Sequence, residues 1–387
     1  NWDDHNRSHR YTAVAMAKQY LDSCEPNAIL YTIGDNDTFP LWYVQEIEHY
    51  RTDVKIVNTS LFMTDWYIDQ MKMKTHKAEG LPISFDRSLY VGDKREGIVF
   101  NTKTKNRWDI HDFLKFAKTE DESHMVEMDS GHKLYFLPTN KIRIPVDKNA
   151  VIANKAVNAK YNDSIVPYID VDIKGGAIYK NRLMMFDVLA NNNWKRPICF
   201  TGGSFGDDDY MWMKDYLQLD GMVYKLVPVR TKVDKENPFD LGMVDTDKMY
   251  NNVMKWDWGN GASPTIYHDP ETRKNSITSR NNLTRLALQL IKEGKKDKAL
   301  TILDLGMKEF PIAYYDYYSA LDNFAVGYYQ INQIEKARKV ISDVANKYKQ
   351  QLRYFSTMKR SDQNFIATEI VTAIERYRAL IQISKSN

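Results

Sequence analysis

Apolar and polar positions along the first 75 residues predict helices and strands in turn. Apolar residues recur at helical spacing over 8–23, and a run of strand length follows at 28–33. Helical spacing returns at Pro40, a residue suited to the first turn of a helix, and continues to about residue 51. A strand is predicted in "DVKIVNTSLF" and a capped helix start in "TDWYIDQMK". This order predicts an open, mainly parallel α/β sheet in three layers.

Residues 76–172 interrupt that order and predict a largely β insertion. Short strand candidates punctuated by Gly and Pro occur at "SLYVG", "GIVF" and "KLYFLP", with one helix at "IHDFLKFAK". The α/β pattern resumes over 173–230, with a helix from Ile178 to Leu189 and strands in "RPICFTGG" and "GMVYKLVPVR". We therefore assign 1–75 and 173–230 to one α/β domain. The polar, turn-rich segment 231–275 is predicted to be a linker.

Residues 276–387 carry an all-helical pattern typical of tetratricopeptide-like repeats. Small and apolar residues fall at the positions where the two helices of such a repeat pack, and a second set follows 38 residues later, as from Ala299 to Ala337. Gly294 and Asn332 suit the turns between paired helices, and 363–383 supplies a closing helix. Solenoid units of this kind bind partners and seldom catalyse.

Composition narrows the classes of function. The chain has 387 residues, 43% of them apolar and 27% charged, which fits two or three folded domains. Its 54 basic and 51 acidic residues are mixed along the chain, so no nucleic-acid footprint is present. Cys24 and Cys199 lie in or beside apolar segments and are expected to be free, buried thiols. No apolar run approaches the ~18 residues that span a bilayer.

The first candidate site is the acidic turn in "YTIGDNDTFPLWY", where Asp35 and Asp37 follow a predicted strand. Ligands of doubly wound folds bind beyond the carboxyl ends of strands. A phosphatase-type D-x-D-x-T is disfavoured because Thr38 comes one place early. A glycosyltransferase-type D-x-D would hold a divalent cation on a nucleotide diphosphate, but no glycine-rich phosphate cradle accompanies it. Alternatively, Asp37 or Thr38 only caps a helix that Pro40 opens.

A second acidic loop, "TGGSFGDDDY", follows the predicted strand at 197–202. It contains a formal G-x-S-x-G around Ser204, the pattern of a serine hydrolase, and His268 is the only histidine downstream. The aspartates 207–209 stand where the nucleophile helix would begin, and their charge would oppose an oxyanion. A stand-alone hydrolase, serine or metal-dependent, is therefore the alternative function.

The two loops form one cleft if the strands at 28–33 and 197–202 are neighbours. Aromatic faces pack on sugar C–H groups and carboxylates accept hydroxyl hydrogen bonds, which suits carbohydrate or peptide recognition. No organic cofactor is expected, and a divalent cation such as Ca²⁺ among the aspartates stays open. Alternatively, the aromatic residues belong to the hydrophobic core, and the acidic residues are solvated or cap helices. The predicted cleft comprises Asp35, Asp37, Trp42, Tyr43, Trp66, Ser204, Asp207, Asp208 and Asp209.

Several long motifs carry a specific resemblance. "NWDDHNRSHRYTA", "GDNDTFPLWYVQE", "TDWYIDQM", "TGGSFGDDDY" and "KDYLQLDGM" resemble the soluble C-terminal region of bacterial polytopic membrane proteins in the protein O-mannosyltransferase-like glycosyltransferase family. The resemblance covers most of the chain. It implies a multi-pass membrane half that precedes this region and carries the active site. It further implies a periplasmic domain at the bacterial inner membrane, whose partners are its own transmembrane half and an acceptor protein or glycan. A purely structural module that stabilises the membrane half is a third possibility.

Overall fold

The computed structural model describes residues 6–102, 104–127, 131–202, 213–231 and 240–386. The chain divides into two compact units, one of residues 17–245 and one of residues 1–16 with 246–387. In the described ranges, no helix combines the length and apolar character that crossing a bilayer requires.

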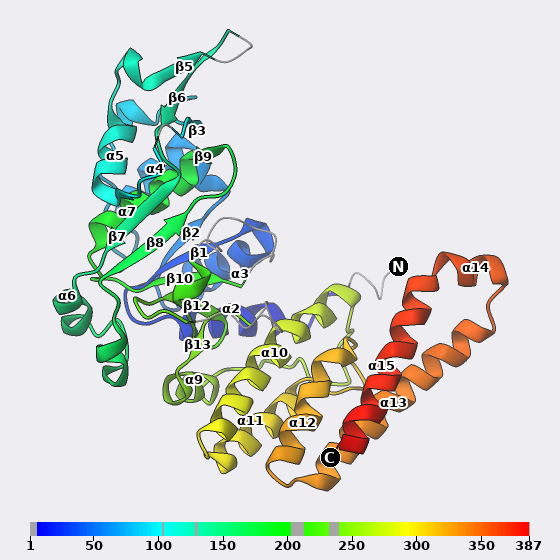
Figure 1. Ribbon diagram of the computed structural model, residues 1–387. Coiled ribbons are helices and arrows are strands. Elements are labelled where there is room, and N and C mark those ends of the chain that lie inside the picture. Colours follow the sequence, from blue (N-terminus) through cyan, green and yellow to red (C-terminus); the bar gives the residue numbers. More distant parts are fainter. Residues whose placement is uncertain (1–5, 103, 128–130, 203–212, 232–239, 387) are drawn as a thin grey trace. The chain divides into compact units, whose positions relative to one another are not determined.

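The unit of residues 17–245 is built on a six-stranded sheet with strand order β13-β11-β12-β10-β1-β2 (Figure 1). β1 pairs in parallel with β10 on one side and β2 on the other. β12 runs antiparallel to both β10 and β11, so the sheet is mixed. The strands are β1 (Ile29–Thr32), β2 (Lys55–Asn58), β10 (Ile198–Thr201), β11 (Leu217–Leu219), β12 (Val223–Leu226) and β13 (Met243–Val244).

Burial along the central strands explains their apolar sequences. Every residue of β1, β2 and β10 is buried, as expected for strands covered on both faces. Cys24 and Cys199 are free and buried, which confirms the prediction for both thiols. The general prediction of an α/β domain followed by helices is confirmed.

The helices of this part of the chain follow the predicted order but differ at one boundary. α3 begins at Gly34, so Pro40 lies inside the helix and not in its first turn. Gly34 has a φ of +69°, which allows the chain to leave β1 and enter the helix without a longer loop. The helices are α2 (Thr12–Ser23), α3 (Gly34–Glu46), α4 (Asp65–Lys72), α5 (Ile110–Lys118), α6 (Lys148–Ala153) and α7 (Lys180–Asn192).

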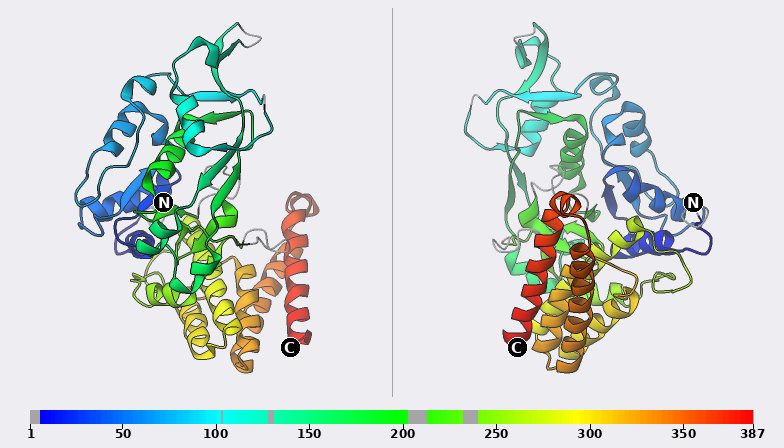
Figure 2. Two further views of the ribbon diagram at one scale, coloured as in Figure 1. Left: turned by 60° about the vertical axis from the view of Figure 1, so that its left-hand side comes forward. Right: turned by 90° about the vertical axis from the view of Figure 1, so that its right-hand side faces the viewer.

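Two smaller sheets are formed between residues 97 and 179, with orders β5-β6-β3-β9 and β4-β7-β8 (Figure 2). Strands are present at "GIVF" and "KLYFLP" as predicted, but "SLYVG" is not a strand. There the Asp86 carboxylate accepts the Ser88 backbone N–H and stabilises a 3-10 turn. The strands are β3 (Gly97–Phe100), β4 (Trp108–Asp109), β5 (Met125–Glu127), β6 (Lys133–Leu137), β7 (Lys141–Pro145), β8 (Tyr168–Asp172) and β9 (Ala177–Tyr179).

The other unit is helical over most of its length (Figure 1). Short turns join α10 to α11 and α12 to α13, and Gly294 and Asn332 take positive φ in them, as their turn positions predict. Ala299 and Ala337 are fully buried. The helices are α9 (Thr246–Val253), α10 (Pro270–Lys292), α11 (Lys296–Glu309), α12 (Asp322–Gln330), α13 (Ile334–Ser356), α14 (Arg360–Phe365) and α15 (Ala367–Ser386).

Close packing at Gly306 gives a test of this helical unit. A Cβ at Gly306 would lie 2.6 Å from Phe324 Cε1, and that ring is fully buried. We expect Gly306→Ala to lower the free energy of unfolding by about 1–3 kcal/mol because the core is overpacked. Urea unfolding followed by circular dichroism measures the change.

Gly327→Ala is the matched control for that variant. It has the same helix-propensity gain, but its Cβ would meet the methyl ends of flexible side chains, those of Leu303 at 3.2 and 3.3 Å and of Leu288 at 3.8 Å. Equal stability of the two variants would contradict the packing explanation.

Candidate functional site

The acidic turn after β1 places its two carboxylates in different surroundings. Asp35 and Asp37 both lie in the first turn of α3, where the helix dipole favours negative charge. Asp35 is exposed and forms no hydrogen bond or ion pair with any residue that the structure describes. Asp37 is partly buried and faces the next strand. The D-x-D pair is therefore not a symmetric pair of ligands.

Asp37 connects the ends of two neighbouring strands. Thr201, the last residue of β10, donates its hydroxyl to Asp37 Oδ2 at 2.7 Å. Burial raises the pKa of Asp37, while the hydrogen bonds from Thr201 and from the Ile33 backbone N–H act in the opposite direction. The expected adjacency of the two strands is confirmed, because Ile29 pairs with Ile198 in the parallel ladder.

A buried polar network lies beside this contact, at the ends of β1 and β2. The hydroxyl oxygens of Thr32 and Thr38 are 2.6 Å apart, and Thr38 donates to the Gly34 carbonyl at 2.6 Å. Asn58 Nδ2 donates to Thr38 Oγ1 at 3.0 Å. Thr38 thus fixes the turn to both strands and does not serve as a simple helix cap. Sequence patterns missed Asn58 because nothing local relates it to Thr38.

A surface groove of about 370 Å³ lies between α3 and α4, beside β2. α3 contributes Trp42 and α4 contributes Trp66, so the structure brings these two predicted residues together. β2 contributes Lys55 and Ile56 between them. Asp35, Asp37 and Tyr43 do not line this groove. The aromatic groove and the acidic turn therefore occupy separate positions on the unit.

The aromatic residues of the groove differ in their exposure to solvent. Trp66 is 54% exposed, and its ring contacts that of Tyr67 edge-on at 5.5 Å. Trp42 is partly buried and stacks on Phe39 at the same centroid distance, 5.5 Å. Large exposed aromatic surface is unfavourable in water and commonly marks a binding site. Trp66 is the most exposed aromatic residue of the predicted site.

Polar groups in the groove are held in place by the protein itself. Lys55 Nζ donates to the Met73 carbonyl at 2.8 Å and to Thr75 Oγ1 at 2.9 Å. Burial, together with the positive charge of Arg196, lowers the pKa of Lys55 to about 8. At the rim, His76 Nε2 and Glu46 Oε2 are 3.0 Å apart. These contacts position the groove walls and leave the aromatic surface as its open face.

Part of the predicted site falls outside the described residues. Ser204 and the aspartates 207–209 lie there, so their contribution to a cleft stays a prediction. In the helical unit, His268 stacks on Tyr314 at 4.9 Å, and its Nε2 is 2.9 Å from the Ser263 carbonyl oxygen. Within the described part of the chain, no three His, Cys, Asp or Glu residues are grouped to hold a metal ion.

A separate cavity of about 350 Å³ lies at the amino end of β10, lined by Arg196, Pro197 and Ile198. Its buried lysine is already paired: Lys225 Nζ contacts Glu25 Oε1 and the Ala156 carbonyl, each at 3.0 Å. The cavity therefore offers mainly apolar surface.

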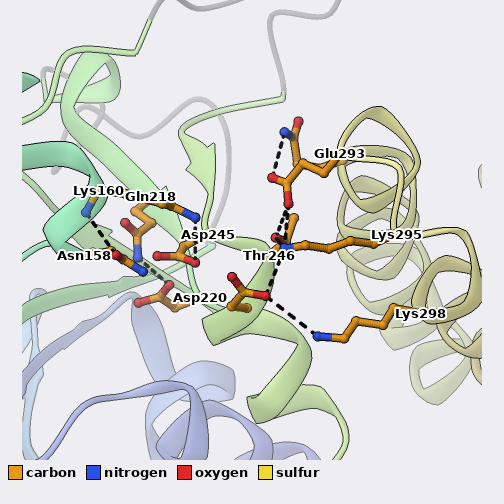
Figure 3. Close-up of polar contacts among 11 residues, drawn as sticks. Asn158, Lys160, Gln218, Asp220, Asp245, Thr246, Glu293, Lys295 and Lys298 are labelled. Carbon is orange, nitrogen blue, oxygen red and sulfur yellow. Dashed lines mark hydrogen bonds and ion pairs between the residues drawn. The ribbon is translucent and has the colours of Figure 1, made fainter.

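Several other conspicuous carboxylates also have structural partners (Figure 3). In the α/β unit, Asp220 accepts from Gln218 Nε2 at 2.7 Å, and Asp245 lies 3.4 Å from Lys160 Nζ. In the helical unit, Glu293 accepts from the Thr246 hydroxyl at 2.6 Å. The pairs of Asp245 and Glu293 join segments 85 and 47 positions apart, whereas Gln218 and Asp220 both lie within the motif "KDYLQLDGM". The other acidic residue of that motif, Asp215, lies 3.3 Å from Arg230 Nη2.

The fold and site define a mixed-sheet α/β domain with an aromatic surface groove, followed in sequence by a helical region. A family model described as TMEM260-associated domain 2 matches residues 13–248, and the chain belongs to this family. Membership ties the domain to membrane proteins that are glycosyltransferase-like and related to O-mannosyltransferases. No curated protein and no solved structure matches the chain.

The raised pKa of Asp37 predicts a pH-dependent stability. The folded protein holds a proton on Asp37 at pH values where the unfolded chain has released it. The natural protein should therefore lose stability, relative to Asp37→Asn, as pH rises from the ordinary aspartate pKa through the raised one. Chemical unfolding at a series of pH values measures this difference.

Asp35→Asn is the matched control, because its carboxylate is exposed in the same helical turn. A pH dependence of the same sign and size in both variants would contradict the assignment to Asp37, and so would a stability difference for Asp37→Asn that does not change with pH.

Proposed function

We propose that this chain is the non-catalytic recognition domain of a membrane-bound protein O-glycosyltransferase, and that it binds an acceptor protein or glycan. The observation that carries this proposal is the open groove between Trp42 and Trp66. Family membership also supports the proposal, because it links the domain to glycosyltransferase-like membrane proteins. In this proposal the domain lies at the periplasmic face of the bacterial inner membrane, beside its own transmembrane half.

The chemistry of the groove suits binding. Indole faces pack against apolar side chains and against the C–H faces of sugars, and both are available in a glycosylation acceptor. Glu46 and Gln70 line the same groove and supply hydrogen-bonding groups at its walls. Lys55 has a lowered pKa but is only 2% exposed, and its amine is hydrogen-bonded to the protein. Lys55 therefore holds the groove wall, while Glu46 and Gln70 are suited to hold a ligand in one orientation.

The helical region is proposed to be a tetratricopeptide-like docking module for the membrane half. Its support is the spacing of the paired helices, with Ala299 and Ala337 buried at equivalent positions. Large side chains also remain uncovered on its last helices: Phe365 is 91% exposed and Tyr354 is 62% exposed. Exposed apolar residues of this size are common in surfaces that bind another protein.

Removing one groove wall tests the proposal. Trp66→Ala in the full-length membrane protein should lower acceptor glycosylation about tenfold, because a central aromatic contact contributes about 1.4 kcal/mol or more. Trp66 is exposed, so the fold should tolerate the change. Mass spectrometry of the acceptor measures the modified fraction.

Tyr43→Ala is the control, since Tyr43 is 48% exposed on the same helix as Trp42 but lies outside the groove. Glycosylation should stay at the level of the unmutated protein. Unchanged glycosylation in Trp66→Ala, with normal expression, would refute the recognition role of the groove.

A further inference from the structure

The groove runs along a free sheet edge. β2 is the terminal strand of the six-stranded sheet, so one side of its backbone has no strand partner. The Lys55 N–H bonds to the Ala28 carbonyl at 2.9 Å, and the Thr59 N–H bonds to the Thr32 carbonyl at 2.9 Å. In a parallel ladder, alternate residues direct their N–H and C=O groups to opposite sides. The backbone groups of Val54, Ile56 and Asn58 therefore face the free edge.

Side chains form hydrogen bonds with the backbone of this edge on both sides of Ile56. Gln45 Nε2 donates to the Val54 carbonyl at 2.9 Å. The Asn58 N–H donates to the Tyr67 hydroxyl at 2.9 Å. No residue in the described ranges hydrogen-bonds the N–H or C=O of Ile56. Ile56 is 4% exposed and lines the groove, so its unpaired backbone groups lie at the floor of the groove, between two positions of the edge that side chains block.

The open residue coincides with the aromatic groove. Ile56 lines the groove together with Trp42 and Trp66, which come from the helices on its two sides. Gln45 and Tyr67, the side chains that complete the edge, line it as well. A ligand between the tryptophans would thus meet one backbone donor and one backbone acceptor.

We propose that the groove binds an extended polypeptide segment, which adds to β2 by pairing with the backbone of Ile56 and places an apolar side chain between Trp42 and Trp66. Every peptide residue except proline presents both an N–H donor and a C=O acceptor at strand spacing, as this edge requires. A neutral glycan could stack on the indoles but does not repeat that pair of groups. The inference rests on the proposed function in one respect: the segment belongs to the acceptor protein.

Backbone methylation of a peptide tests this pairing. The probe is the peptide acetyl-Thr-Val-Thr-Trp-Thr-Val-Thr-amide, whose single tryptophan fixes its register, titrated into the 387-residue chain by calorimetry. One residue of the bound peptide donates its N–H to the Ile56 carbonyl. N-methylation of that residue should weaken binding about tenfold, because the carbonyl loses its donor. Methylation of the two adjacent residues should change affinity less than about twofold, since their N–H groups face away.

Hydrogen exchange supplies a readout on the protein. The Ile56 amide should exchange more slowly when the peptide is added than in the free chain. The Val57 amide pairs with β1, so its protection should not change. Trp66→Ala should weaken peptide binding, while Tyr43→Ala should not.

The outcomes separate this inference from the proposed function. Binding of maltopentaose without binding of the peptide would overturn strand addition but support glycan recognition. Peptide binding with equal sensitivity to methylation at every position, or without protection of Ile56, would also overturn strand addition and leave acceptor recognition standing. If neither probe binds and Trp66→Ala keeps full glycosylation activity, both ideas are wrong.

Discussion

β1 pairs in parallel with a strand on each side, and this arrangement positions every feature of the candidate site. Parallel strands end at the same edge of a sheet, so the last residues of β1, β2 and β10 are brought together. That edge gathers Thr32, Asn58 and Thr201, which are buried and polar. Buried polar groups must be hydrogen-bonded, and the first turn of α3 supplies Asp37 and Thr38 as partners.

The position of β2 at the end of the sheet explains the groove. Helices follow β1 and β2 in sequence, and together they flank the free edge that a further strand would otherwise cover. An uncovered edge leaves backbone groups without partners, which is unfavourable unless side chains or a ligand satisfy them. Gln45 and Tyr67 satisfy two of these positions, and Ile56 remains. The groove is therefore a consequence of strand order as much as of side-chain identity.

Local patterns were sufficient to predict most elements, because helical and strand periodicity depend on neighbours in sequence. α5 begins and ends where "IHDFLKFAK" predicts, and Trp42 and Trp66, both named for the candidate site, line one groove. Tyr43 was included with them, but one residue turns a helix by about 100°, which directs it away from the groove. The helix start at Gly34 was missed because Pro40 gave the stronger local signal.

Features that depend on the arrangement of strands had no local signal. The open edge at Ile56 exists only because β2 is terminal in the sheet, and "KIVN" reads as any other buried strand. The reversal of β12, which makes the sheet mixed, likewise depends on pairing with β10 and β11. The partnership of Asp37 with Thr201 joins residues 164 positions apart. Such contacts require the sheet order, which composition and periodicity do not specify.

Several carboxylates in the α/β unit form structural hydrogen bonds, and this bears on whether the domain binds a ligand or catalyses a reaction. Asp187 is fully buried and accepts from Ser84 Oγ at 2.6 Å and from Lys118 Nζ at 3.2 Å. Asp37 and Asp220 are engaged in the same way by Thr201 and Gln218. A buried carboxylate that lost these partners would be left without hydrogen bonds, which costs free energy. Its exchange of protons with a substrate is therefore restricted. Exposed indole and open backbone groups are free of that constraint, and they are the groups that binding a polypeptide uses.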